Sequence, residues 1–206
     1  MRTTTNVAKT AVAAWILLMA CMGSKAAAQD TKVGFAVGAA VPATGIGIKE
    51  IGPSLSGWVA RPIGGPFNWR VEVGGARLQM SDSSRFRCAA AGLYCDVSLN
   101  VASLTGGVHL EPRAEKAIAP YGYATLGLYR LSASAEALDL HEGSIQESSS
   151  WTDNAFGIAL GSGIRIRLSG RTAFRAELRY SGFHYKPETQ HWASLLTPSL
   201  TTSVAF

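Results

Sequence analysis

Apolar and polar residues alternate along most of the chain, and the alternation is clearest in the last third. In residues 156–168 one face collects Phe156, Ile158 and Leu160, while the opposite face collects glycine, alanine and arginine. Residues 172–184 and 196–206 repeat the pattern. A period of two places successive side chains on opposite faces of a β-strand, whereas a helix would scramble these sets. The three segments are therefore predicted to be strands.

Five earlier segments complete a predicted set of eight strands: 31–41, 53–61, 67–80, 97–111 and 120–132. In residues 97–111 the apolar positions change phase, from Leu99 and Val101 to Leu104 and Val108, and Gly74-Gly75 interrupts residues 67–80. We interpret both features as β-bulges. After residue 28 no apolar run approaches the 18 or so residues of a transmembrane helix.

The links between the predicted strands alternate in length. Three are short, at residues 62–66, 112–119 and 169–171; the other four are long or intermediate, at 42–52, 81–96, 133–153 and 186–193. All long loops then lie at one end of the strand array, and both chain ends lie at the other. This asymmetry, with strands of 9 to 15 residues, predicts an all-β fold, an eight-stranded antiparallel up-and-down transmembrane β-barrel with extracellular loops and periplasmic termini.

The first 28 residues have the composition of a cleaved signal peptide. Arg2 and Lys9 precede the apolar run 11–22, and the small residues 26–28 supply a cleavage site. A membrane anchor is the alternative, and Cys21 approaches a lipoprotein cleavage box, which leaves lipidation of Cys21 open. We expect cleavage after Ala28, so that residues 29–206 form a single barrel domain.

The net charge of the chain does not point to a nucleic-acid partner once the signal peptide is removed. The 206-residue chain has 19 basic and 14 acidic residues, a formal net charge of +5, and only 16% charged residues. The predicted signal peptide removes Arg2, Lys9 and Lys25, which leaves 16 basic residues and a net charge of +2. A nucleic-acid partner is therefore not expected.

Charged residues recur at i, i+2 spacing on the polar face of the predicted strands. Such residues share one face, and the lumen of an eight-stranded barrel is only wide enough to hold side chains. We expect a salt-bridge network that plugs the lumen, formed by Arg70, Glu72, Arg165, Arg167, Arg175, Glu177 and Arg179.

Aromatic residues gather near both ends of the predicted strands. We expect them to form two interfacial girdles that flank a lipid-facing apolar band. The predicted turn-end girdle comprises Trp58, Phe67, Trp69, Tyr121, Tyr123, Phe174 and Phe206, and the loop-end girdle comprises Tyr129, Phe156, Phe183 and Tyr185.

Four segments together resemble a known superfamily. They are Pro120-Tyr121-Gly122-Tyr123 followed by Gly127, the strand from Gly157 to Gly163 that continues into Arg165-Ile166-Arg167, Ala176-Glu177-Leu178-Arg179-Tyr180, and the closing Ser203-Val204-Ala205-Phe206. Residues 29–206 resemble the small outer-membrane β-barrels, the superfamily of the OmpA barrel domain and the OmpX/Ail and opacity-like proteins.

The resemblance implies a location, an assembly route and partners. Its C-terminal pattern looks like the signal read by the barrel-assembly machinery, here Leu200, Thr202, Val204 and Phe206. It also implies the outer membrane of a Gram-negative-type bacterium, contact with outer-membrane lipid and lipopolysaccharide, and a monomer. No cofactor is expected, and no peptidoglycan-binding domain is expected after the barrel.

Two loop features bear on candidate chemistry. Cys88 and Cys95 enclose six residues and are the two cysteines left after signal cleavage, so a loop disulfide is predicted. Metal binding by the two thiols is the alternative, but no further cysteine or histidine pair accompanies them. The acidic residues of 133–153, including Glu136, Glu147 and Asp153, lack calcium-loop spacing, so we interpret them as solvated loop charge.

Four function classes remain open. We expect a non-enzymatic barrel with a structural or surface-interaction role through its extracellular loops. A narrow porin-like channel is the alternative, followed by a soluble lipocalin-like binder and a lipid A-modifying enzyme. His184-Tyr185 resembles the lipid A deacylase barrels, yet Lys186 stands where that family has its serine, and Ser181 belongs to the opposite face of the strand.

Overall fold

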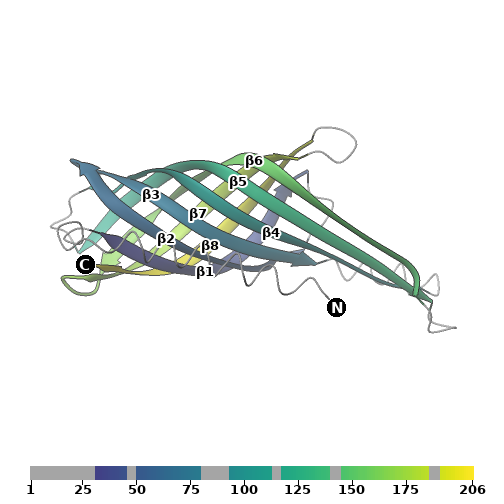
Figure 1. Ribbon diagram of the computed structural model, residues 1–206. Helices are drawn as coiled ribbons and strands as arrows, with labels where there is room; N and C mark the ends of the chain where they lie inside the picture. The colour runs from purple at the N-terminus through teal and green to yellow at the C-terminus, as the bar shows by residue number, and fades with distance from the viewer. Residues whose placement is uncertain (1–30, 46–49, 80–92, 113–116, 140–144, 186–190) are drawn as a thin grey trace.

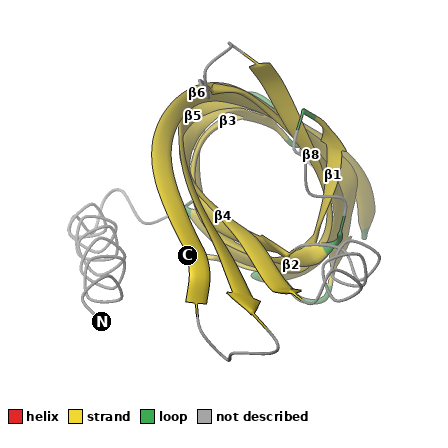
Figure 2. Cartoon of the chain, turned by 90° about the vertical axis from the view of Figure 1, so that its right-hand side faces the viewer, coloured by secondary structure: helices red, strands yellow, loops and turns green. Residues whose placement is uncertain are grey.

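The chain folds into a closed antiparallel barrel in which each strand pairs with its neighbours in sequence order and β1 pairs with β8. The computed structural model describes residues 31–45, 50–79, 93–112, 117–139, 145–185 and 191–206. The strands are β1 (Lys32–Thr44), β2 (Gly52–Gly64), β3 (Phe67–Gln79), β4 (Leu93–Leu110), β5 (Ile118–Asp139), β6 (Ile145–Arg167), β7 (Thr172–Tyr185) and β8 (His191–Ala205) (Figure 1). Figure 2, viewed along the barrel, shows them as a closed ring. The predicted eight-stranded up-and-down barrel is confirmed.

The two ends of the barrel are distinguished by the links and chain ends that lie at each. At one end, here called the turn end, Gly65 takes a φ of 57° in the link from β2 to β3, and the N–H groups of Leu168 and Ser169 donate to the Thr172 carbonyl between β6 and β7. The chain also enters and leaves at this end, where the Phe206 N–H donates to the Thr31 carbonyl at 2.9 Å. The opposite end is called the loop end. The predicted signal peptide, with Cys21, lies outside the described residues.

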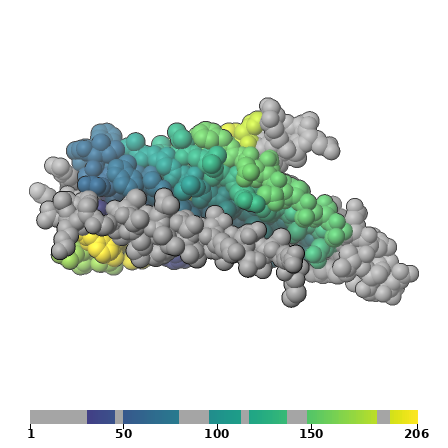
Figure 3. Space-filling model, viewed as in Figure 1, coloured from purple at the N-terminus to yellow at the C-terminus, as the bar shows by residue number. Residues whose placement is uncertain are grey.

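The three longest strands project beyond the others at the loop end (Figures 1 and 3). Among the described residues, β4 pairs with β3 from Ser98 onward, and β6 pairs with β7 from Phe156 onward. Residues 93–97, 133–139 and 145–155 therefore form a three-stranded sheet, here called the β4–β6 extension. The prediction of a loop at 133–153 was wrong, because most of these residues continue β5 and β6. The segment is rich in serine and alanine, which differ little in hydrophobicity, so no alternation of apolar and polar residues indicated strands.

The predicted bulge in β4 was also wrong. β4 pairs without interruption with β3 and β5, so the phase change reflects a change of environment. Leu99 and Val101 face the lumen and are 4% and 5% exposed, whereas Leu104 and Val108 face outward and are 53% and 44% exposed. Gly74-Gly75 also pairs in register. The irregularities lie instead near strand ends, at residues 42–44, 62–64 and 137–138.

The outer surface of the barrel carries a band of exposed aliphatic side chains. Its members include Val37, Leu55, Val73, Leu104, Val108, Leu126, Leu128, Ile158, Leu160, Ile164, Leu178, Leu196 and Leu200. An outward apolar band of this kind is characteristic of barrels that face lipid. Within the described residues, no helix is long and apolar enough to span a membrane.

The aromatic residues divide between the two faces, which corrects the predicted girdles. Phe67, Trp69, Phe156 and Phe206 are exposed on the outer face, as expected. Trp58, Tyr121, Tyr123, Tyr129 and Phe183 instead point into the lumen and are buried. An aromatic ring suits either a lipid interface or a packed interior, so position near a strand end did not determine the face. The side chain of Tyr185 lies outside the described residues.

Candidate functional site

The lumen contains two layers of side chains stacked along the barrel axis. The layer nearer the turn end is built from charged and aromatic residues, and the layer nearer the loop end is an apolar cluster. Both layers follow from strand alternation, because every second residue of each strand faces inward.

Glu72 is the first centre of the charged layer. It lies on β3 and accepts hydrogen bonds from Nε and Nη2 of Arg70 at 3.1 and 2.7 Å. It also accepts one from Arg179 on β7, across the lumen. Arg70 in turn lies 3.7 Å from Glu177 on β7, measured from Nη1 to Oε2. Opposite walls of the barrel are thus joined by buried ion pairs.

Glu177 is held by two tyrosines of β5. The hydroxyls of Tyr121 and Tyr123 donate to its two carboxylate oxygens at 2.8 and 2.5 Å. Glycines of β6 leave room for these rings, because a Cβ at Gly161 would collide with the ring of Tyr123, and one at Gly163 would lie 3.0 Å from Tyr121. Small residues on β6 therefore position the aromatic donors of β5.

Trp58 lies between two arginines in the same layer. The guanidinium carbons of Arg70 and Arg175 lie 4.7 and 4.6 Å from the centre of its ring, and Arg70 lies 3.8 Å from that of Tyr123. A cation over an aromatic face is stabilised by the ring quadrupole, more so when water is excluded. These inward aromatics therefore pack directly against the charge network.

Glu111 is the second centre, and the sequence analysis did not single it out. It directly follows β4 and accepts from Arg175 Nη2 at 3.1 Å and from Arg165. Lys32 Nζ lies 3.2 Å away and His109 Nε2 lies 3.6 Å away. Glu111 shares parity with the inward residues His109 and Thr105, and this spacing is the signal that could have found it.

The structure brings together six of the seven residues predicted for the network. Arg70, Glu72, Arg165, Arg175, Glu177 and Arg179 are all buried in the lumen. Arg167 lies at the end of β6 and is exposed. Of the predicted assembly signal, Leu200, Thr202, Val204 and Phe206 all lie exposed on the outer face.

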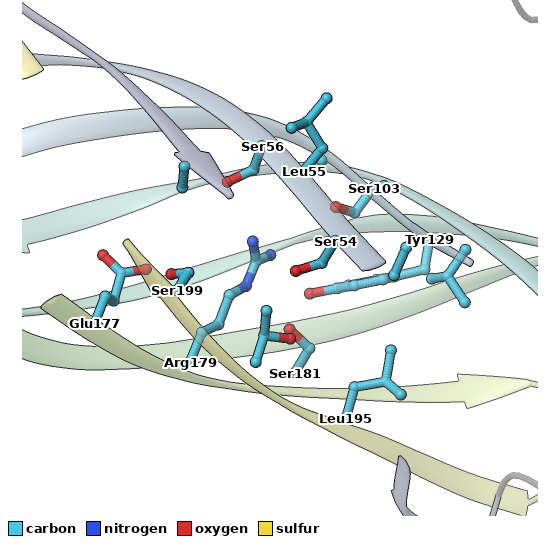
Figure 4. Close-up of a pocket in the computed structure, with 16 residues that line it drawn as sticks. Ser54, Leu55, Ser56, Ser103, Tyr129, Glu177, Arg179, Ser181, Leu195 and Ser199 are labelled. Carbon is cyan, nitrogen blue, oxygen red and sulfur yellow. The ribbon is translucent and has the colours of Figure 1, made fainter. Parts of the chain in front are cut away.

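The apolar cluster occupies the loop-end half of the lumen around Phe183 and Tyr129, whose rings stack with centroids 5.0 Å apart. The cluster comprises Ala40, Leu78, Leu99, Val101, Tyr129, Leu131, Ala155, Phe183, Ala193 and Leu195. A cavity of about 40 Å³ lies beside it, lined by Ser54, Ser56, Ser181 and Arg179 among others (Figure 4). A polar cavity of this size suits a few water molecules.

The histidine, serine and cysteines considered for other chemistry were not predicted to belong to the charge network. His184 is exposed on the outer face, paired in register with Phe156 and Trp192, whereas Ser181 is buried in the lumen. The prediction that these two residues do not meet is confirmed. Cys88 and the side chain of Cys95 lie outside the described residues, so the disulfide stays a prediction.

Comparison with known proteins identifies the fold. No family model matches the chain, and no curated protein matches it in sequence. Neisserial surface protein A is similar in structure, with 15% identity over 85% of this chain and 97% of that one, at a TM-score of 0.55. The attachment invasion locus protein Ail of Yersinia pestis is similar over 86% of this chain and 97% of that one, with 14% identity and a TM-score of 0.51. The chain has the fold of the small outer-membrane β-barrels. The resemblance stated from the sequence is confirmed at the level of the fold.

Proposed function

We propose that this protein is a monomeric outer-membrane barrel of a Gram-negative-type bacterium, closed to solutes, that acts as a structural or surface-interaction protein through its loop end. The turn end and both termini face the periplasm in this proposal, and the loop end faces the outside. No enzymatic step is assigned to it.

The distribution of polarity supports a membrane location. The exposed aliphatic band lies outside, and ion pairs lie inside. A soluble lipocalin-like binder would require the reverse arrangement, a polar exterior around an apolar ligand cavity. Outer-membrane lipid and lipopolysaccharide are the proposed partners of the band. Leu200, Thr202, Val204 and Phe206 are the proposed contact with the barrel-assembly machinery.

The observation that carries the surface role is the β4–β6 extension. It continues the sheet past the rest of the barrel, and among the described residues its two outer strands, 93–97 and 145–155, pair on one side only. Edges of this kind present backbone donors and acceptors to a partner. Ail is known in complex with the heparin analogue sucrose octasulfate, but a polyanion suits this extension poorly, since it carries Glu136, Glu147 and Asp153.

Photo-cross-linking in intact cells tests the partner and the orientation together. A photoreactive phenylalanine analogue replaces Phe156, on the barrel wall near the loop end, or Phe67 at the turn end, two exposed aromatic positions. We expect the analogue at position 156, but not at position 67, to cross-link to lipopolysaccharide, which occupies only the outer leaflet. Cross-linking from position 67 alone, or from neither position, would contradict the proposal.

Epitope insertion gives a second test of orientation. One variant carries the epitope in the link 140–144, and the matched control carries it at Gly170, where the turn has open space. Antibody should reach the first epitope on intact cells and the second only after the membrane is permeabilised. The reverse order would overturn the proposed topology.

The narrow channel remains the competing function, and the two layers of the lumen argue against it. Ion pairs and aromatic rings occupy the turn-end half, and the apolar cluster occupies the loop-end half. An eight-stranded barrel has little space beyond such side chains. Planar-bilayer recordings of the purified protein should show no stable conductance steps, and reproducible steps would favour the channel instead.

A further inference from the structure

A cavity of about 460 Å³ opens at the turn end of the lumen, below the charged layer. Its lining includes five basic residues, Lys32, Arg165, Arg167, Arg171 and Arg175, and one acidic residue, Glu111. The basic side chains come from β1, β6, β7 and the link between β6 and β7, and Glu111 directly follows β4. The link is fixed locally, because the Ser169 hydroxyl accepts from the N–H groups of Arg171 and Thr172 at 3.3 and 3.1 Å.

Around Glu111, the charges that the described residues supply to this cavity do not balance. Glu111 is shared by Lys32, Arg165 and Arg175, so one carboxylate faces three cations at close range. His109 adds no negative charge, and the other carboxylates that the described residues place in the lumen, Glu72 and Glu177, belong to the pairs with Arg70 and Arg179. Buried charge without compensation is costly, which leaves a strongly positive cavity that an anion would stabilise.

Two of the arginines also retain unused hydrogen-bond donors. Arg165 and Arg175 are only 7% and 1% exposed. Within the described part of the chain, Nε and Nη2 of Arg165 and Nε and Nη1 of Arg175 have no hydrogen-bond partner. Buried guanidinium donors are normally satisfied, and both residues line the cavity. Within the described residues, the guanidinium donors without a partner and the surplus of positive charge therefore occur at the same place.

We propose that the turn-end cavity is a binding site for a phosphate group, either free or as a phosphomonoester. Guanidinium groups present paired N–H donors that match the oxygens of phosphate, and such charge-assisted bonds are about twice as strong as neutral ones. Arg165 and Arg175 supply the buried donors, Lys32 and Arg171 add charge, and Glu111 holds three of the cations around the cavity. The volume leaves room for a small organic group attached to the phosphate.

Isothermal titration calorimetry on the folded full chain in a zwitterionic detergent tests the site. Inorganic phosphate and glycerol 3-phosphate are titrated separately, with glycerol as the uncharged probe. We expect saturable binding of one or both phosphates and none of glycerol. Tighter binding of glycerol 3-phosphate would identify a headgroup-like monoester as the ligand, and tighter binding of inorganic phosphate would identify the free anion.

Three variants locate the binding. Arg165→Gln should weaken it by about tenfold or more, the loss expected for a charged hydrogen bond. Arg171→Gln should weaken it less, because this exposed turn residue contributes charge at a larger distance, and it provides a test if Arg165→Gln fails to fold. The control is Arg61→Gln, an exposed arginine of β2 that does not line the cavity. Undetectable binding to the wild type, or equal binding by all three variants, would overturn the proposal.

Discussion

Arg179 and Glu72 form an ion pair across the lumen, although they lie 107 residues apart in the chain. Their strands, β7 and β3, are not neighbours in the barrel. Glu72 also accepts two hydrogen bonds from Arg70 on its own strand. A single carboxylate thus holds two buried guanidinium groups and connects opposite walls of the barrel.

Replacement of this carboxylate is expected to destabilise the barrel strongly. Glu72→Gln leaves Arg70 and Arg179 without their shared anion, and breaking a buried ion pair by removing one partner costs about 3 to 5 kcal/mol. The measurement is the free energy of unfolding in urea, followed in lipid vesicles by tryptophan fluorescence and by heat-modifiable migration on gels.

The matched control for this prediction is Glu136→Gln. Glu136 is exposed on the β4–β6 extension, and surface substitutions of this kind usually change stability by no more than about 0.5 kcal/mol. Equal stability of the two variants would contradict the role assigned to Glu72.

The glycines beneath the lumen tyrosines are expected to be sensitive to a single methyl group. In Gly161→Ala the new Cβ collides with the ring of Tyr123, so the ring must move away from Glu177, and overpacking of this kind costs about 1 to 3 kcal/mol. In Gly75→Ala the Cβ only reaches the Val101 carbonyl oxygen, at 3.6 Å, an ordinary contact. Unfolding free energies should separate the two variants, and a stable Gly161→Ala would contradict the packing described.

The strand pattern was predictable because lipid and lumen impose opposite polarity on alternate residues. That contrast is strong in β7, where Arg175, Glu177 and Arg179 face inward, and the pattern correctly placed them on one face. It is weak wherever the lumen is apolar. Leu99 and Val101 belong to the apolar cluster in the lumen. Because the prediction placed apolar residues on the lipid side, the change of phase after Val101 was wrongly interpreted as a bulge.

The partners of the network were harder to predict than its arginines. Glu111 directly follows β4 and precedes Pro112, so its parity with His109 was the one local signal that it faces the lumen. Trp58, Tyr121 and Tyr123 have side chains that suit both faces, and their inward orientation depends on glycines of neighbouring strands, Gly34, Gly161 and Gly163. The packing of a ring over a glycine of the next strand depends on the register of the two strands, and alternation within one strand does not specify that register.

The C-terminal residue is expected to affect assembly more than stability. The side chain of Phe206 is exposed on the outer face, and the backbone N–H of this residue donates a hydrogen bond to the Thr31 carbonyl. Phe206→Ala therefore leaves both this backbone bond and the packing of the lumen unchanged. In cells the amount of folded barrel in the outer membrane should fall several-fold, while the refolded variant unfolds in urea at nearly the wild-type concentration. Val37→Ala, a change on the outer face of β1, is the control. Unchanged assembly of Phe206→Ala would contradict the proposed signal.

The two layers of the lumen are expected to close the barrel independently, because they lie in series along its axis. The double variant Leu78→Ala/Phe183→Ala removes two large side chains from the apolar cluster. A second double variant, Glu72→Ser/Arg179→Ser, removes the ion pair across the lumen. Arg70 keeps its contact with Glu177 in this second variant. Neither variant alone should conduct ions in planar bilayers, since the other layer still blocks the path, whereas their combination should give small steady currents. Phe156→Ala, on the outer face, is the control for altered lipid contacts. If either double variant conducts as well as the combination, one layer alone closes the lumen, and the serial arrangement is wrong.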